Sequence, residues 1–314
     1  MSEESPYLSL VLTGRNDNYG GDFRSRLQRC VSNAFEQLIK HGISSELIFL
    51  NYNPVNENAP IAQFIDWPTS TEKVSVRIIT ISNEIHRHLV ADGSRKSVPV
   101  LEYLGKNAGI KRAKGQFILS MNPDIILPSE LVFLLKKLRK DTYYRTDRID
   151  FEGDLNAEHQ LQRIFLKGQD YPINNTSQIT ELRFKNSLLN RWKVFTPRIK
   201  GLLNRFSKTV YYDNRECRFH CNVSGDFMLM HRDHWHTLNG HNEQAFMALH
   251  VDSLMVIQAA FLPLKEKVLH SPIFHQEHTR RYDANLDNPE FKRAWDIYRS
   301  EAAEIERSAR TKVY

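Results

Sequence analysis

The stretch that decides the fold is Lys106–Leu127, which reads KNAGIKRAKGQFILSMNPDIIL. A basic segment with helical periodicity ends at Gly115, and a short apolar run, Gln116–Met121, stops at the Asn-Pro-Asp of positions 122–124. This order predicts a helix, a buried strand and a carboxylate at the end of the strand. A buried carboxylate is costly unless a cation or a ligand balances it, and open α/β sheets bind ligands at the carboxyl ends of strands. Asp124 is therefore a candidate active-site carboxylate.

Outward from this stretch, strands and helices alternate along the first half of the chain. Apolar, β-branched runs predict strands, and apolar residues with a helical period predict helices. The expected strands are Leu8–Thr13, Glu46–Asn51, Val74–Ile81 and Gln116–Met121, and the expected helices are Phe23–His41 and Val100–Lys114. The alternation predicts parallel β-α units with right-handed crossovers, so the expected fold class is α/β.

The second half of the chain has a weaker pattern. From Asp141 to about Cys217 the alternation is lost. The expected elements after it are a strand at Gly225–His231, a turn at His234–Leu238, a helix at Ala245–Phe261, a short histidine-rich segment at His270–His278 and a charged terminal helix at Pro289–Thr311.

The composition narrows the class of protein. The 314 residues carry a net charge of +6 and are 41% hydrophobic, which suits a folded core and modestly favours anionic partners. The cysteine count of 3 argues against a disulfide framework and suits a reducing compartment. The acidic start lacks the pattern of a secretory signal, and no apolar run reaches the length of a membrane span. We therefore expect a cytoplasmic protein.

Positions 180–210 form a basic segment, with eight Lys or Arg residues against one acid and apolar side chains between them. Two interpretations follow. The segment is a helical insertion that packs on the main domain with a solvated basic face, or it lies on an anionic membrane surface. The second interpretation would place the protein at the inner face of a membrane, as a peripheral membrane protein.

Carboxylates at the ends of expected elements are the other candidates for chemistry. They are Asp17, Asp124, Asp226, Glu243 and Asp252. Mg²⁺ or Mn²⁺ is often held by one or two carboxylates together with substrate phosphates, so such acids suit a diphosphate site. Nine of the 13 histidines lie between positions 220 and 278, and imidazole is both a metal ligand and a proton carrier. The sequence contains no Walker A, GxGxxG or GxSxG motif and no paired CxxC or HExxH zinc signature.

These residues make the chain resemble glycosyltransferases of the GT-A fold, of the family 2 type that uses nucleotide-sugar donors. Three pieces carry the resemblance: LSLVLTGRNDN at the first strand, KNAGIKRAKGQFILSMNPDIIL at the metal motif, and SGDFMLMHRDHWHTLNGHNE followed by HVDSLMVIQ. They cover most of the chain outside positions 150–215 and the C-terminal tail. The resemblance implies a Rossmann-like, mostly parallel central sheet flanked by helices, with a basic helical insertion and a C-terminal helix.

The resemblance also implies a donor site. Its residues would be Thr13, Arg15 and Asp17 around the base and ribose, with Asn107 and Lys111 near the donor. Positions 122–124 take the place of the family's DxD motif, whose last Asp binds the divalent ion, Mn²⁺ or Mg²⁺, that bridges the diphosphate. Asn122 stands where the family has the first Asp, which weakens one contact to ribose or metal.

The catalytic groups follow from the same resemblance. Asp252 comes after a Gly-x-x-Glu segment at the start of a helix, the position of the family's base, and would deprotonate the acceptor hydroxyl in an inverting transfer. Asp226 and Glu243 would bind hydroxyls of the acceptor or of the donor sugar. A histidine near the end of the domain can complete the metal shell, and both His275 and His278 are candidates.

The resemblance thus implies a metal-assisted, inverting glycosyltransferase of polysaccharide biosynthesis, with a UDP-sugar as the favoured donor, a glycan or glycolipid acceptor and no nucleic-acid partner. The expected organisation is a nucleotide-sugar-binding half at 1–150, a basic helical insertion at 151–215, an acceptor-binding and catalytic half at 216–280 and a helical tail at 281–314. One alternative is a nucleotidyltransferase that makes a nucleotide-sugar from a sugar phosphate, although the GxGxR-like loop expected after the first strand is missing. The other alternative is a non-enzymatic basic module that binds membranes or nucleic acid.

Overall fold

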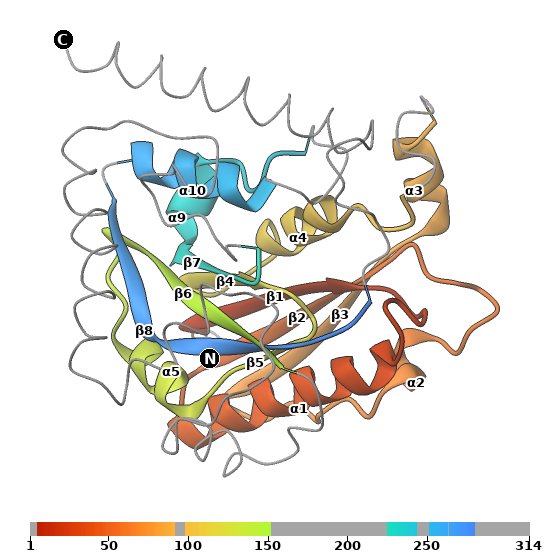
Figure 1. The fold of residues 1–314 in the computed structure, drawn as a ribbon, viewed down its shortest axis with the longest axis horizontal. Helices are drawn as coiled ribbons and strands as arrows, with labels where there is room; N and C mark the ends of the chain where they lie inside the picture. Colours follow the sequence, from red (N-terminus) through yellow and green to blue (C-terminus); the bar gives the residue numbers. More distant parts are fainter. Residues whose placement is uncertain (1–4, 92–97, 152–224, 244–250, 263, 280–314) are drawn as a thin grey trace.

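A mixed sheet of eight strands runs through the described part of the chain, in the order β3-β2-β1-β4-β7-β6-β8-β5 (Figure 1). The computed structural model describes residues 5–91, 98–151, 225–243, 251–262 and 264–279. The strands are β1 (Leu8–Gly14), β2 (Ser45–Tyr52), β3 (Val74–Ile81), β4 (Phe117–Met121), β5 (Ile125–Ile126), β6 (Thr142–Phe151), β7 (Phe227–His231) and β8 (Lys265–Gln276). The helices are α1 (Phe23–His41), α2 (Ile61–Phe64), α3 (Asn83–Leu89), α4 (Glu102–Ile110), α5 (Ser129–Leu134), the 3₁₀ turn η1 (Leu135–Lys137), α9 (Arg232–Thr237) and α10 (Val251–Phe261).

The four strands β3, β2, β1 and β4 are parallel neighbours. Strands β1, β2 and β4 are buried along their whole length, as expected for parallel strands that are covered on both faces. Each of the four strands differs from its expected bounds by at most one residue at either end. The prediction of a Rossmann-like α/β sheet flanked by helices is confirmed.

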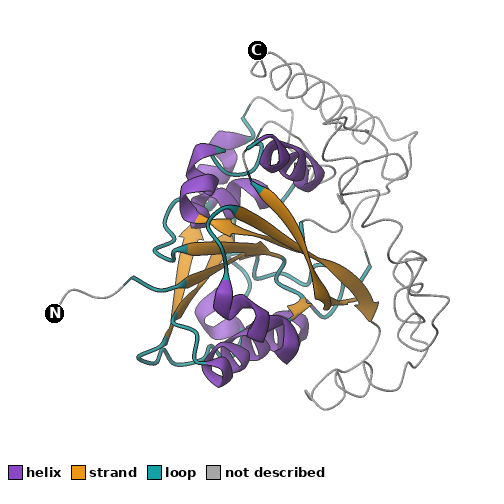
Figure 2. Cartoon of the chain, turned by 90° about the vertical axis from the view of Figure 1, so that its left-hand side faces the viewer, coloured by secondary structure: helices purple, strands orange, loops and turns teal. Residues whose placement is uncertain are grey.

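Helices cover both faces of the sheet (Figure 2). On one face, α1 packs on the central strands through a core that includes Leu10, Leu12, Leu27, Val31 and Phe49. On the other face, α4, α9 and α10 pack through a second core that includes Val11, Ile110, Ile118, Trp235 and Val256. The alternation of Leu10, Val11 and Leu12 between the two cores is the two-residue period of a strand with two buried faces.

Helix α4 lies close against β1 because glycines occupy the points of contact. A Cβ atom on Gly109 would lie 2.5 Å from Cγ1 of Val11, and one on Gly105 would lie 2.6 Å from Cγ2 of Thr13. Any larger residue would push the helix away from the strand. This contact places the N-terminal turns of α4 at the carboxyl end of β1.

The half of the sheet with mixed strand directions contains the main differences from the expected pattern: β7 is antiparallel to β4 and β6, and β6 is parallel to β8. Strands β6 and β8 are long, whereas the alternation was expected to be lost after Asp141 and His270–His278 was expected to be a short segment. Both strands carry charged side chains that are buried in pairs, such as Arg148 with Asp150 and Asp226. Buried charges hide the apolar pattern by which a buried strand is recognised, so the prediction was wrong here.

The segment His234–Leu238, expected as a turn, mostly belongs to the short helix α9. Nδ1 of His231 accepts a hydrogen bond from the main-chain N–H of Asp233 at 3.2 Å and caps the helix. The buried indole of Trp235 donates to the carbonyl of Ile118 at 2.9 Å. The cap and the buried indole stabilise a helical turn that periodicity alone does not reveal.

Several expected elements lie outside the described residues. They are positions 152–215 of the basic insertion expected at 151–215, the helical tail at 281–314 and the first part of the expected helix Ala245–Phe261, of which α10 is the described part. Within the described ranges, no helix is long and apolar enough to cross a membrane.

Candidate active site

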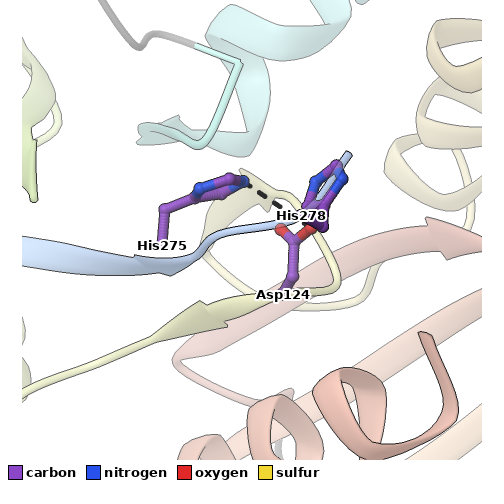
Figure 3. Close-up of side chains that lie close together, drawn as sticks. All are labelled: Asp124, His275 and His278. Carbon is purple, nitrogen blue, oxygen red and sulfur yellow. Dashed lines mark ion pairs between the residues drawn. The ribbon is translucent and has the colours of Figure 1, made fainter. Parts of the chain in front are cut away.

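Asp124 lies in the turn between β4 and β5, next to strand β8. Its main-chain carbonyl accepts a hydrogen bond from the N–H of Gln276 at 3.1 Å, and Ile125 pairs with His275 in the antiparallel contact of β5 with β8. This pairing brings His275, and His278 just after β8, to the carboxylate of Asp124 (Figure 3). Asp124 is only 4% exposed, so its carboxylate needs partners within the protein or a ligand.

The partners of the Asp124 carboxylate crowd one of its two oxygens. Oδ2 lies 3.2 Å from Nε2 of His278, 3.7 Å from Nε2 of His275 and 3.0 Å from Nη1 of Arg26. Oδ1 is buried and has no hydrogen-bond partner within the part of the chain that the structure describes. Because buried acceptors are normally satisfied, Oδ1 of Asp124 is a candidate ligand atom.

The side chains of Asp124, His275 and His278 fit a divalent metal ion. One ligand atom from each lies within 4.8 Å of the others. A carboxylate with two imidazoles suits a transition ion such as Mn²⁺ better than Mg²⁺, which prefers oxygen ligands throughout. Both histidines that the resemblance left as alternatives face the carboxylate (Figure 3).

The electrostatics of the cluster hold Asp124 ionised. Burial alone would raise the pKa of Asp124, but His275, His278 and Arg26 outweigh it and lower the pKa well below its ordinary value. Burial opposes a proton on His275, but the carboxylates of Asp124 and Asp150 outweigh it and raise the pKa of this imidazole. A metal ion at this site must therefore displace a proton that His275 holds more firmly than usual.

Asp226, directly before β7, is a second buried carboxylate, and its contacts are all made by the protein. Oδ1 accepts from Nδ2 of Asn122 at 2.7 Å, and Oδ2 accepts from Nη1 of Arg148 at 2.7 Å. Arg148 also forms an ion pair with Asp150, whose Oδ1 lies 3.0 Å from Nδ1 of His275. This series of contacts connects Asp226 to the metal-binding cluster through strand β6.

Asn122 lies between Asp226 and the ammonium group of Lys106. Its Oδ1 accepts from Nζ of Lys106 at 2.6 Å, and Lys106 is 0% exposed. Lys106 also donates to Oε1 of Glu102 at 2.6 Å and to the carbonyl of Gly225 at 3.0 Å, so its three protons are all used. Both ends of the Asn122 amide are therefore held by protein groups, and an Asp at this position would lose the hydrogen bond to Asp226.

Asp252 lies in the first turn of α10 and reaches the same segment. Its Oδ2 accepts a hydrogen bond from the N–H of Gly225 at 3.0 Å, and its side chain is half-buried. A Cβ atom on Gly225 would lie 2.8 Å from the hydroxyl of Tyr103 and 3.3 Å from Oδ2 of Asp252. Gly225 and Asp226 thus connect Asp252 to Asn122 and through it to the turn that carries Asp124.

The structure brings Asn107 and Glu243 together. Nδ2 of Asn107 donates to Oε1 of Glu243 and to the carbonyl of His241, each at 2.8 Å, and Oδ1 accepts from the N–H of His241 at 2.8 Å. His241 is buried, and its Nε2 lies 3.0 Å from the hydroxyl of Ser120 on β4. Asn107 therefore holds the Gly-x-x-Glu loop against α4.

Three of the expected donor-binding residues lie at the carboxyl end of β1. Thr13 is buried in the strand, and its hydroxyl has no hydrogen-bond partner among the described residues. Nε of Arg15 donates to the carbonyl of Asn53 at 2.5 Å, and Nη1 of Arg15 lies 3.5 Å from Oδ2 of Asp17. The position agrees with a ligand site at the carboxyl ends of parallel strands.

Lys111 lies at the other end of α4. It is the exposed C-cap residue of the helix, five residues after Lys106. A rise of about 1.5 Å per residue places Lys111 about 7 Å beyond Lys106 along the helix axis. Lys106 is the residue that contacts Asn122, so Lys111 lies away from that contact.

Sequence reasoning missed four charged residues of the site: Arg26, Lys106, Arg148 and Asp150. Arg26 left a signal, because it interrupts the buried apolar face of α1 next to Leu27. Lys106 gave a weaker signal, because it follows Glu102 by four residues, the spacing of an ion pair on a helix. Arg148 and Asp150 left none, since their partners become visible only when β6 is paired with its neighbours.

Comparisons with known proteins give likenesses of fold. Neither a protein-family model nor a curated protein sequence matches the chain. The mannosyltransferase PcManGT from Pyrobaculum calidifontis, solved with GDP-Man and Mn²⁺, is similar at 10% identity and a TM-score of 0.48, over 98% of this chain and 74% of that one. The catalytic domain of Drosophila β1,4-galactosyltransferase 7 in complex with xylobiose is similar at 10% identity and a TM-score of 0.44, over 92% and 79%.

S. aureus TarS, residues 1–349, is similar at 12% identity and a TM-score of 0.40, over 86% of this chain. The matched part of this chain spans 60% of the length of that TarS fragment. With identities this low, these likenesses assign no role to any residue.

Proposed function

We propose that the chain is a glycosyltransferase that moves a sugar from a nucleotide-sugar donor to an acceptor hydroxyl. The observation that carries the proposal is the environment of Asp124, a buried carboxylate at the carboxyl end of a strand. Two imidazoles lie beside it, and its Oδ1 has no hydrogen-bond partner among the described residues. A nucleotide-sugar needs such a site because its leaving group is a diphosphate whose negative charge grows as the sugar departs.

Asp124, His275 and His278 would hold the divalent cation, with Mn²⁺ favoured over Mg²⁺ by the two imidazoles. When bound, the cation supplies a Lewis acid that offsets the charge of the diphosphate. The protein itself places two further cations in the cluster, Arg26 and Arg148, and both are buried or nearly so. These guanidiniums keep the carboxylates ionised and in place before any ligand arrives.

Asp252 is the proposed base of an inverting transfer. Its half-buried carboxylate accepts a main-chain hydrogen bond from Gly225, at the start of a helix. From there it would take the proton of the acceptor hydroxyl while the oxygen attacks the anomeric carbon. The acceptor would be a glycan or a glycolipid, and Glu243 and Asp226 would bind hydroxyls of the acceptor or of the donor sugar.

The donor would lie along the carboxyl ends of β1 and β4. Thr13, Arg15 and Asp17 would contact the base and ribose, and a UDP-sugar is the favoured donor. Asn122, held by Lys106 and Asp226, would position the turn that carries Asp124. A role in polysaccharide biosynthesis and a peripheral position at the inner face of a membrane complete the proposal.

The test is a screen of nucleotide-sugar hydrolysis with Mn²⁺ present, because transferases release donor sugar to water slowly and the acceptor need not be known. We expect one nucleotide-sugar to be hydrolysed by the wild type and not by Asp124→Ala, while Asp66→Ala, a change to an exposed acid outside the cluster, keeps the activity. Absence of hydrolysis and of nucleotide binding across UDP-, GDP-, CMP- and dTDP-sugars would contradict the proposal. Release of pyrophosphate from a nucleoside triphosphate would indicate a nucleotidyltransferase instead.

The variant Asp252→Asn distinguishes a role of Asp252 as catalytic base from a role in binding the donor. Removing a general base lowers the rate of transfer by about 10²–10⁴-fold. Stabilisation of the fold by nucleoside diphosphate and Mn²⁺ should remain, because Asn keeps the hydrogen bond to Gly225. An equal loss of binding and rate would assign Asp252 to the structure of the site.

A further inference from the structure

Arg26 is a buried cation in direct contact with the carboxylate that would bind the metal ion. Nη1 donates to Oδ2 of Asp124 at 3.0 Å, and Arg26 is 2% exposed. Nη2 donates to the carbonyls of Tyr19 and Gly21. The main chain of Arg26 is also held, since the amide of Gln276 donates to its carbonyl at 2.9 Å.

These contacts fix the guanidinium where it is. Its two terminal nitrogens bind groups on different segments, so Arg26 cannot turn away from Asp124 without losing buried hydrogen bonds. A divalent ion sits about 2.1 Å from a carboxylate oxygen, so an ion on either oxygen of Asp124 would lie within about 7 Å of Nη1, which is 3.0 Å from Oδ2. Two cations so close in a site shielded from water repel each other strongly.

The charges of the whole cluster lead to the same result. Three carboxylates, Asp124, Asp150 and Asp226, face two guanidiniums, Arg26 and Arg148. With neutral imidazoles the net charge of the cluster is −1, and a bound divalent ion changes it to +1. A diphosphate beside the ion makes the net charge negative again, so each of the two favours binding of the other.

We propose that Arg26 is a positioning residue that satisfies Asp124 while the metal site is empty and makes cation binding depend on a diphosphate. The divalent ion binds weakly by itself and tightly together with the diphosphate, because Arg26 opposes the ion until further negative charge enters the site. The inference rests on the proposed function, in which the donor carries that diphosphate. Arg26 makes no contact with the ion.

The test measures protein-bound Mn²⁺ by equilibrium dialysis, with and without inorganic pyrophosphate on both sides of the membrane. Pyrophosphate itself binds Mn²⁺, so the comparison counts only the ion that the protein retains. We expect pyrophosphate to strengthen Mn²⁺ binding to the wild-type protein by at least tenfold. Arg26→Gln removes the competing charge, so it should bind Mn²⁺ at least tenfold more tightly than the wild type when pyrophosphate is absent. The gain from pyrophosphate should be smaller in this variant than in the wild type.

Two further variants control for the loss of a charge and for damage to the fold. Arg29→Gln removes a cation one turn along the same helix, where the guanidinium binds Gln276 and lies 3.8 Å from Asp22, and it should bind Mn²⁺ as the wild type does. Arg26→Lys keeps the charge and should also resemble the wild type. If Arg26→Gln does not fold, Arg26→Met, which removes the same charge with an unbranched side chain, is measured in its place.

Unchanged or weaker Mn²⁺ binding in Arg26→Gln would overturn the inference, as would a wild type that binds Mn²⁺ equally well with and without pyrophosphate. A protein that binds no Mn²⁺ under any condition would overturn it too. The proposed function fails by a separate measurement, the absence of nucleotide-sugar hydrolysis and binding.

Discussion

Two buried carboxylates of the site, Asp124 and Asp226, have opposite environments. Each oxygen of Asp226 accepts one short hydrogen bond, from Asn122 and from Arg148, both at 2.7 Å. The ion-pair contacts of the Asp124 carboxylate with the described residues fall on Oδ2, and Oδ1 has no hydrogen-bond partner among these residues. The difference teaches that burial alone does not identify a functional acid. Protein groups use both oxygens of Asp226, whereas Asp124 keeps an oxygen for a ligand.

The largest expected effect tests the structural side of this comparison. Arg148→Met should lower the free energy of unfolding by about 3–5 kcal/mol, because it leaves Asp226 and Asp150 buried without their cation. Urea unfolding measures the change. The matched control is Arg139→Met, whose ion pair with Asp141 is exposed and screened by water, so its loss should change the free energy of unfolding little. A similar small loss in both variants would show that Asp226 does not depend on Arg148.

A smaller effect is expected from placing a second carboxylate against Asp226. Asn122→Asp replaces a hydrogen bond of 2.7 Å by the repulsion of two acids and should cost about 1–3 kcal/mol of unfolding free energy. Adding Asp226→Asn reverses the direction of the hydrogen bond, so the double variant should be more stable than the sum of the single changes predicts. Simple additivity in urea unfolding would mean that the two side chains do not interact.

The smallest expected effect is the pH dependence of the metal-free protein. The pKa of His275 is raised above its ordinary value of 6.5, so its contribution to stability is fully present below pH 6.5 and is lost as the pH rises through the raised pKa. The pKa of Asp124 is lowered, so its contribution is present above the ordinary value of 3.8 and is lost as the pH falls. His275→Gln should remove the decline in stability above pH 6.5, measured by urea unfolding with a chelator present.

His88→Gln, a change to an exposed histidine of α3, is the control for this pH effect and should leave the decline unchanged. With Mn²⁺ in excess the slope should reverse in the wild type, because the metal binds deprotonated imidazole. A decline that persists in His275→Gln would place the titrating group elsewhere.

The parallel half of the fold could be predicted from the sequence because three of its strands, β1, β2 and β4, are covered on both faces and are rich in apolar residues. Leu8–Gly14 and Phe117–Met121 are examples, and Gly115 marks the end of the helical segment before β4. The half with mixed strand directions could not be predicted in the same way. Residues such as Arg145 and Asp150 are buried in β6, and their partners lie far away in the chain.

Of the candidate site, only the three residues that would bind the metal ion could be proposed from the sequence. Asp124 could be found from its place after an apolar run, and His275 and His278 from the resemblance of the chain. Arg26 lies 98 residues before Asp124, and nothing local in the sequence indicates that the two side chains meet. The pairing of β5 with β8 decides the geometry, and pairing of distant segments is what single-sequence patterns do not contain.

The central claim, that Asp124 and not Asp226 is the acid open to a metal ion, is tested most directly by counting bound Mn²⁺ in the presence of UDP. We expect the wild type and Asp226→Asn each to bind one Mn²⁺, and Asp124→Asn to lose the ion with at least a hundredfold fall in affinity. A bound Mn²⁺ retained by Asp124→Asn, or lost from Asp226→Asn while that variant stays folded, would contradict the account.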